Sequence, residues 1–193
     1  FRSLLKNLAV PEEKNSEDSG LHYSLVQDWP DFEKLKKRLS DEKQWAFDFE
    51  TTGTDPLLAE PIGVSFSFHE KEAAYVSFSG TGKVLDAKSC LLFLKDLFED
   101  PKIKKIGQNL KYEMLILKNF GIELQGIHFD TMIASYLLNS GERRHNMDDM
   151  AVDYLSYKTI TYDELVGTGK KRQNLYDIDP DLVSDYACED ADI

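Results

Sequence analysis

The sequence has few cysteines and no long hydrophobic segment, and these two absences exclude several classes of protein. Its two cysteines among 193 residues, Cys90 and Cys188, form neither a disulfide framework nor a metal-binding motif. Both lie in apolar helical patterns, so we expect buried free thiols, as in a reducing cytoplasm. No apolar run approaches the roughly 20 residues that span a bilayer, and the first residues lack a signal-peptide core. We therefore predict a cytoplasmic protein with no membrane association.

Positive charge is also scarce. The chain has 23 Lys and Arg residues against 35 Asp and Glu, a net charge of −12. This balance disfavours non-specific wrapping of a nucleic-acid duplex. It does not exclude a nucleic-acid substrate, because bound divalent cations reverse the local field of an acidic centre. Basic residues cluster at 104–105, 143–145 and 170–172. These side chains either contact phosphate groups or form ordinary solvent-exposed surfaces.

The length is sufficient for one domain with its own core, and the sequence contains no internal repeat. Residues 1–20 are polar and charge-rich, so we interpret them as a linker that leads into a domain formed by residues 21–193. The chain begins with Phe rather than Met. We expect it to be a fragment of a longer chain.

Hydrophobic periodicity predicts a sheet covered by helices. The expected strands are 22–26, 44–49, 61–69, 72–78 and 102–107. The expected helices are 31–39, 87–99, 109–120, 130–139, 146–155 and 180–193. Strands come first and then alternate with helices, which indicates an α/β fold with a mixed sheet. An antiparallel arrangement of the second to fourth strands is the simplest.

Two acids lie within the most apolar of these strands. Asp48 and Glu50 are two residues apart, so both side chains project from the same face of the strand. Two buried carboxylates repel each other and are costly to desolvate unless a cation neutralises them. An ordinary solvated position is the alternative, which the apolar flanks disfavour. The pair therefore indicates a divalent metal site.

Two predicted helices add further candidates. Asn109 and Glu113 are four residues apart and face the same way, and Tyr186 and Asp190 repeat this spacing. Oxygen ligands of this kind suit Mg²⁺ or Mn²⁺, and two such ions promote in-line phosphoryl displacement. The alternatives are a surface acid at Glu113 and a core aromatic at Tyr186.

Three segments resemble, in order, the exonuclease motifs of the DEDDy superfamily: residues 47–51 (FDFET), 107–113 (GQNLKYE) and 186–192 (YACEDAD). More narrowly, they resemble the proofreading 3′→5′ exonuclease domain of family A polymerases, the bacterial DNA polymerase I family. Further agreement comes from residues 129–132 (FDTM), 144–148 (RHNMD) and 158–162 (KTITY). Three ordered motifs are far more specific than a lone pair of acids. The resemblance implies a ribonuclease H-like mixed β-sheet flanked by α-helices.

The resemblance also implies a role for each candidate. Asp48 would contact both metal ions, while Glu50 and Asp190 would complete the tighter site, with Zn²⁺ an alternative to Mg²⁺ or Mn²⁺ at one position. Tyr186 would orient the attacking water. Glu113 stands where the family has an aspartate that serves the second ion, usually through water.

Four further positions correspond to residues that touch the terminal nucleotides in the family. Thr51 would lie beside the 3′ end, and Asn109, Tyr112 and Tyr176 would contact the strand. Tyrosines can stack on unpaired bases. A helix cap is the alternative for Asn109, and packing is the alternative for Tyr176.

These expectations define a function and two competitors. The resemblance implies a metal-dependent exonuclease that releases nucleoside monophosphates from single-stranded or frayed DNA 3′ ends. It would be a monomer whose partners are DNA and the polymerase domain of its own parent chain. One competitor is an RNA-processing exonuclease of the ribonuclease D type. The other is a catalytically silent module, which the glutamate at Glu113 favours slightly.

Overall fold

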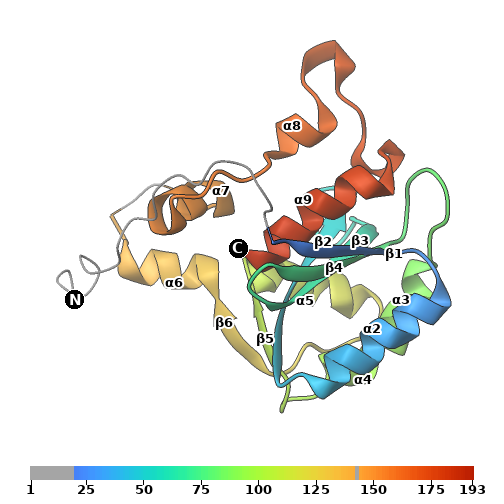
Figure 1. Ribbon diagram of the computed structural model, residues 1–193. Helices are drawn as coiled ribbons and strands as arrows, with labels where there is room; N and C mark the ends of the chain where they lie inside the picture. Colours follow the sequence, from blue (N-terminus) through green and yellow to red (C-terminus); the bar gives the residue numbers. More distant parts are fainter. Residues whose placement is uncertain (1–19, 142–143) are drawn as a thin grey trace.

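A six-stranded mixed sheet forms the centre of the molecule (Figure 1). The computed structural model describes residues 20–141 and 144–193. The predicted linker, residues 1–20, lies outside this range except for Gly20. In order across the sheet the strands are β1 (His22–Val26), β4 (Glu72–Ser77), β3 (Pro61–His69), β2 (Gln44–Thr51), β5 (Lys104–Gly107) and β6 (Ile127–Asp130).

The predicted antiparallel arrangement is confirmed for the middle of this sheet. β2 pairs antiparallel with β3, and β3 pairs antiparallel with β4. The outer pairs β1–β4, β2–β5 and β5–β6 are parallel. Parallel neighbours need crossover connections, and helices supply these.

The helices flank the sheet. They are α2 (Trp29–Asp41), α3 (Ala87–Phe93), α4 (Lys95–Phe98), α5 (Leu110–Asn119), α6 (Thr131–Leu138), α7 (Met147–Met150), α8 (Tyr162–Val166) and α9 (Pro180–Asp192). Short turns of other helix types occur at η1 (Ala151–Leu155), η2 (Gly169–Lys171) and η3 (Leu175–Asp177). α9 begins as the sequence predicts, because the Asp179 side chain accepts the Asp181 N–H and Pro180 occupies the first turn. The α/β fold with a mixed sheet is confirmed.

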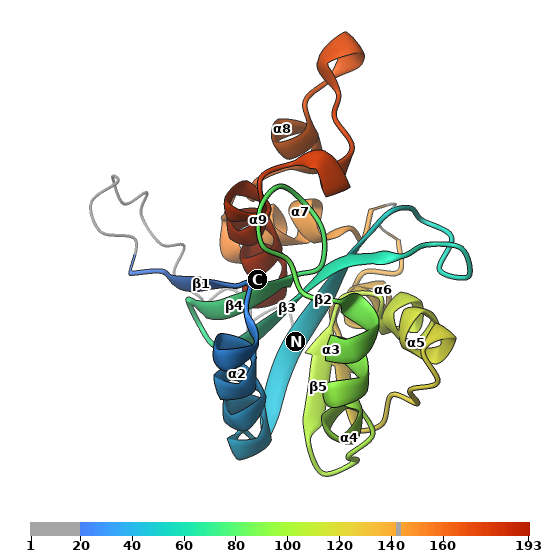
Figure 2. The ribbon, with the colours of Figure 1, turned by 90° about the vertical axis from the view of Figure 1, so that its right-hand side faces the viewer.

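Different sets of helices cover the two faces of the sheet (Figure 2). Helices α2 to α5 pack on one face and bury a large apolar cluster that includes Phe32, Trp45, Phe66, Phe98 and Ile116. α9 lies across the other face, over β1 to β4, with a smaller cluster that includes Ile62, Tyr75, Val183 and Ala187. Strand alternation places the odd-numbered residues of β2 on the first face and the even-numbered ones beneath α9.

The structure corrects four details of the predicted elements. The helix expected at 87–99 is divided at Leu94, where the chain tightens and the Leu97 N–H donates to the Leu94 carbonyl. The helix expected at 146–155 is α for one turn and then widens into the π-helical η1. β6 is a strand that periodicity missed, because it lies at the sheet edge with most residues exposed. α8, also missed, is a five-residue helix with a capping box formed by Thr161 and Glu164.

The two cysteines are confirmed as buried free thiols. Among the helices that the structure describes, none has the length and apolar character needed to traverse a lipid bilayer.

Candidate active site

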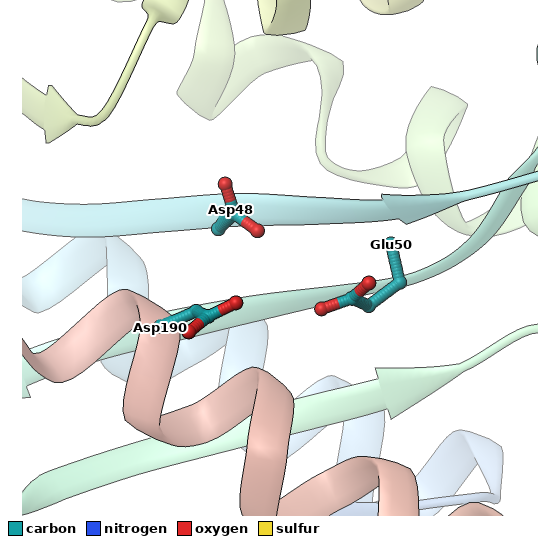
Figure 3. A group of neighbouring side chains, drawn as sticks. All are labelled: Asp48, Glu50 and Asp190. Carbon is teal, nitrogen blue, oxygen red and sulfur yellow. The ribbon is translucent and has the colours of Figure 1, made fainter. Parts of the chain in front are cut away.

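Three carboxyl groups from distant parts of the chain meet beneath α9. Asp48 and Glu50 reach this point from β2 and Asp190 from α9, and Figure 3 shows the three groups directed toward one another. One oxygen from each lies within 4.8 Å of the others. The structure therefore brings together the acids that the sequence predicted on separate elements.

Local features of β2 and β3 set the position of Glu50. The pairing register shifts between Glu50 and Thr51, an irregularity that redirects side chains at a strand end. Gly63 of β3 is the partner of Glu50, and a Cβ at Gly63 would overlap the Tyr75 ring. Glycine thus allows the aromatic ring to pack under this end of the strand, close to the acid.

Burial raises the pKa of every acid in the cluster. Desolvation raises the pKa of Asp48 to about 7, and desolvation together with the charge of Asp48 raises that of Asp190 to about 8. Glu50, which is only 7% exposed, is shifted well upward by burial and by the charges of Asp48 and Asp190. Without a cation, these groups hold protons near neutral pH.

Glu113 is buried beside this cluster but does not belong to it. Its side chain is 3% exposed, so the alternative of a surface acid on α5 is wrong. Burial and the charge of Asp48 raise its pKa well above the ordinary value. It lies outside the group of three carboxylates within 4.8 Å of one another. Its position near, but not in, the group of three carboxylates is compatible with a contribution to a metal site from a greater distance.

The donor set fits a divalent cation. Glu50 Oε1 and Glu113 Oε2 are buried and have no hydrogen-bond partner among the described residues. Buried oxygens without partners are costly, and mutually repelling carboxylates add to the cost. A hard cation such as Mg²⁺ or Mn²⁺ would both coordinate the carboxylate oxygens and neutralise their mutual repulsion.

Tyr186 is one helical turn before Asp190 on the same face of α9 and is partly buried. Burial raises its pKa strongly, and the nearby charges of Asp190 and Glu50 add to the shift. The hydroxyl therefore remains protonated and can donate or accept a hydrogen bond at the edge of the acid cluster. Its role as the residue that orients water stays a prediction.

Three of the four residues predicted to bind substrate, Thr51, Tyr112 and Tyr176, lie around one end of β2. Thr51 Oγ1 and Tyr112 Oη are 2.6 Å apart, which joins β2 to α5. Thr51 and the 45%-exposed Tyr176 both line a cleft of about 210 Å³. The structure thus brings Tyr176 to the same edge as Thr51, although the two are far apart in the sequence.

Asn109 occupies the N-cap position of α5, as the alternative predicted, but its side chain makes no capping hydrogen bond. It adopts a left-handed backbone (φ 58°), and the cap comes from Asp130 at the end of β6. The Asp130 carboxylate accepts the N–H groups of Asn109 and Leu110 at 3.3 and 2.8 Å. It also accepts the Ile133 N–H, and so it fixes the start of both α5 and α6.

Sequence reasoning gave Asp130 no function. The available signal was an aspartate directly before the helix that begins at Thr131. Its second contact, to α5, depends on the β5–β6 pairing and was not visible in the sequence. Because α5 carries Glu113, Asp130 is part of the framework that positions the site.

Acids that converge from a central strand and from the helix that crosses the sheet are the kind of site that metal-dependent phosphoryl-transfer enzymes use. A family model described as 3′-5′ exonuclease matches residues 23–193, and the chain belongs to this family. It is 41% identical over 177 residues to DNA polymerase I of Pseudomonas aeruginosa, a match that covers 89% of this chain and 19% of that protein. It is 36% identical over 169 residues to DNA polymerase I of Rhizobium leguminosarum, with 77% and 16% covered. The chain thus spans less than a fifth of these relatives.

Solved structures have the same fold at lower sequence identity. NrnC of Brucella melitensis has a TM-score of 0.64 and 21% identity, over 90% of this chain and 76% of that one. The catalytic core of RRP6 from Trypanosoma brucei has a TM-score of 0.67 and 20% identity, over 100% and 51%. A further NrnC structure, with a TM-score of 0.59, 18% identity and 89% and 75% coverage, contains bound Mg²⁺.

Proposed function

We propose that this chain is a metal-dependent exonuclease that hydrolyses the terminal phosphodiester at single-stranded or frayed DNA 3′ ends. The products would be nucleoside monophosphates, and the activity would serve as the editing function of a DNA polymerase. One observation carries the proposal: Asp48, Glu50 and Asp190 converge within 4.8 Å in a chain of the 3′-5′ exonuclease family.

The proposed chemistry is in-line hydrolysis assisted by two divalent cations. When bound, Mg²⁺ or Mn²⁺, with Zn²⁺ an alternative at one position, would activate water and stabilise the leaving oxygen. Asp48, Glu50 and Asp190 would hold these ions, and Glu113 would serve the second from a greater distance. The Tyr186 hydroxyl would orient the attacking water. The Mg²⁺-bound NrnC structure supports the choice of metal by analogy of fold.

The strand terminus would lie at the edge of the sheet near Thr51. Thr51 and Tyr112 form a joined pair there, and Tyr176 lines the same cleft as Thr51. An exposed tyrosine can stack on any base, which suits an enzyme that removes nucleotides without sequence preference. Asn109, whose side chain is not used as a cap, would contact the terminal nucleotide.

An RNA substrate is the second candidate, because the fold is shared with RRP6 and NrnC. The identity to DNA polymerase I is much higher, so DNA is the proposed substrate. The partners would be the DNA strand and the polymerase domain of the parent chain, with the chain acting as a monomer in the cytoplasm.

The test is digestion of matched 5′-labelled DNA and RNA strands with Mg²⁺, with Mn²⁺, and with a chelator. We expect stepwise shortening of DNA from the 3′ end, release of nucleoside monophosphates, and no reaction with the chelator. Faster digestion of RNA would favour the second candidate. Mn²⁺ binding without digestion of either strand would indicate a silent module.

A further inference from the structure

The residue next to Asp190 has a carboxylate that is not part of the acid cluster and has partners of its own. Glu189 is 4% exposed, and both of its oxygens accept hydrogen bonds. Tyr157 Oη donates to Oε1 at 2.6 Å, and the Ile160 backbone N–H donates to Oε2 at 2.6 Å. Both donors belong to the segment between η1 and α8, about thirty residues earlier in the chain. Glu189 is therefore a buried anchor for the last turn of α9 rather than a member of the acid cluster.

Asp192 anchors the same turn on its other side. Its carboxylate accepts Tyr23 Oη at 2.9 Å and the Lys71 backbone N–H at 2.8 Å. These donors lie on β1 and on the turn between β3 and β4. The last turn of α9 is thus held from two directions, and Asp190 lies between the two anchors.

Residues 157–160, which donate the hydrogen bonds to Glu189, are themselves held in place by a hydrogen bond to α7. Thr159, which is 4% exposed, donates from Oγ1 to Asp148 Oδ1 at 2.5 Å, and Asp148 lies on α7. Glu189 therefore joins α9 to α7 through residues 157–160. A contact at Glu189 constrains both the axial position of α9 and its rotation about the helix axis. Asp190, the next residue, projects about 100° further around the helix and is constrained with it.

A helix end needs such support when it carries a metal ligand. The carbonyl groups of the last turn have no partners within the helix, so this turn frays most easily. A functional carboxylate must be held within about 0.5 Å of its working geometry by its surroundings. Asp190 lies in the last turn of α9, where the helix alone does not provide that precision.

We propose that Glu189 is a positioning residue that holds Asp190 in the metal-binding cluster by tying the last turn of α9 to residues 157–160. The inference rests on the proposed function, since it assigns Asp190 to a metal site. Loss of an interaction behind a metal ligand typically lowers metal affinity or activity by about 10–100-fold. Glu189 would contact neither metal nor substrate, so the effect of replacing it would appear in metal affinity and kcat.

The test compares Mn²⁺ binding to the wild-type chain, Glu189→Ala and Glu189→Gln by electron paramagnetic resonance, with kcat and KM on a DNA strand. We expect Glu189→Ala to weaken Mn²⁺ binding and lower kcat by about 10–100-fold, with KM for DNA within about threefold. Glu189→Gln should stay within about threefold of wild type. Its amide oxygen can accept the Ile160 N–H, while its NH₂ group donates to Tyr157 Oη.

Asp86→Ala is the matched control, because Asp86 caps α3 through the Ser89 N–H on the other side of the sheet. It should reduce stability without changing Mn²⁺ affinity. If Glu189→Ala does not fold, Tyr157→Phe removes one of the two hydrogen bonds and should weaken Mn²⁺ binding about threefold or more. A folded Glu189→Ala or Tyr157→Phe chain with wild-type Mn²⁺ affinity would overturn this inference and leave the proposed function intact. A wild-type chain that binds no Mn²⁺ overturns the proposed function and this inference with it.

Discussion

The two faces of the central strand β2 carry opposite kinds of side chain. On the face covered by α2 to α5, β2 contributes Trp45, Phe47 and Phe49, all buried in the large apolar cluster. On the face beneath α9, the same strand contributes Asp48 and Glu50. On one face β2 therefore supplies apolar burial that stabilises the fold, and on the other it carries carboxylates whose burial opposes folding.

The comparison shows how a small domain tolerates a destabilising site. Strand alternation lets a residue that favours folding follow directly after one that opposes it. β3 repeats the pattern, with Val64 and Phe66 in the apolar cluster and Ser65 on the α9 face. Stability and chemistry are thus separable by single substitutions on adjacent residues.

The largest effect, on the exonuclease rate, is expected from replacing an acid on the face beneath α9. Asp48→Asn should lower the exonuclease rate by about 10³-fold or more, because a metal contributes several kcal/mol to transition-state stabilisation. The unfolding midpoint in a chelator should be unchanged or higher, because the variant removes a desolvated acid whose charge opposes ionisation of its neighbours. Single-turnover kinetics and thermal denaturation measure the two quantities. A variant that loses stability and activity together would show that Asp48 also stabilises the fold.

The adjacent residue on the apolar face should give the opposite result. Phe47 is 1% exposed, so Phe47→Ala should lower the free energy of unfolding by about 3–5 kcal/mol. Denaturant titration measures the loss. The matched control is Phe129→Ala on β6, where the ring is 49% exposed and the cost should be under about 1 kcal/mol. Equal losses at the two positions would show that the face beneath α2 to α5 is not the main source of stability.

A smaller effect is expected from pH in the absence of metal. The pKa of Asp48 is raised to about 7 and that of Asp190 to about 8, so the folded chain binds more protons than the unfolded chain between about pH 4 and pH 8. Stability should therefore decrease as pH rises through this range. Each kcal/mol lost lowers Tm by about 2–4 °C for a chain of this size.

Calorimetry across this range, with a chelator and with saturating Mg²⁺, measures the effect. Mg²⁺ should remove the decrease, because it binds the ionised carboxylates and stabilises the folded chain. Asp48→Asn should flatten the profile in the chelator. A Tm that does not depend on pH without metal would contradict the raised pKa values.

The site was predictable from the sequence where its geometry is local. Alternation in β2 placed Asp48 and Glu50 on one face, and helical spacing placed Asp190 near Tyr186. β6 was missed because an exposed edge strand shows no alternation. The supporting contacts were missed for a different reason. The hydrogen bond from the Ile160 N–H to Glu189 joins residues 29 apart, and only the folded chain brings them together.

The smallest expected effect is at Glu113, where the resemblance to the exonuclease motifs implies an aspartate. Glu113→Asp keeps the charge but shortens the side chain, which moves the carboxylate by roughly 1 Å. Displacements of this size can change rates by up to about a hundredfold. Glu113 already lies outside the tight group, so we expect a reduction of only about 3–10-fold in kcat. Glu113→Gln, which removes the charge and keeps the length, is the matched control and should cost more. A Glu113→Asp chain that is faster than wild type would show that the backbone of α5 does not compensate for the longer side chain. The glutamate would then lower the rate relative to an aspartate at this position.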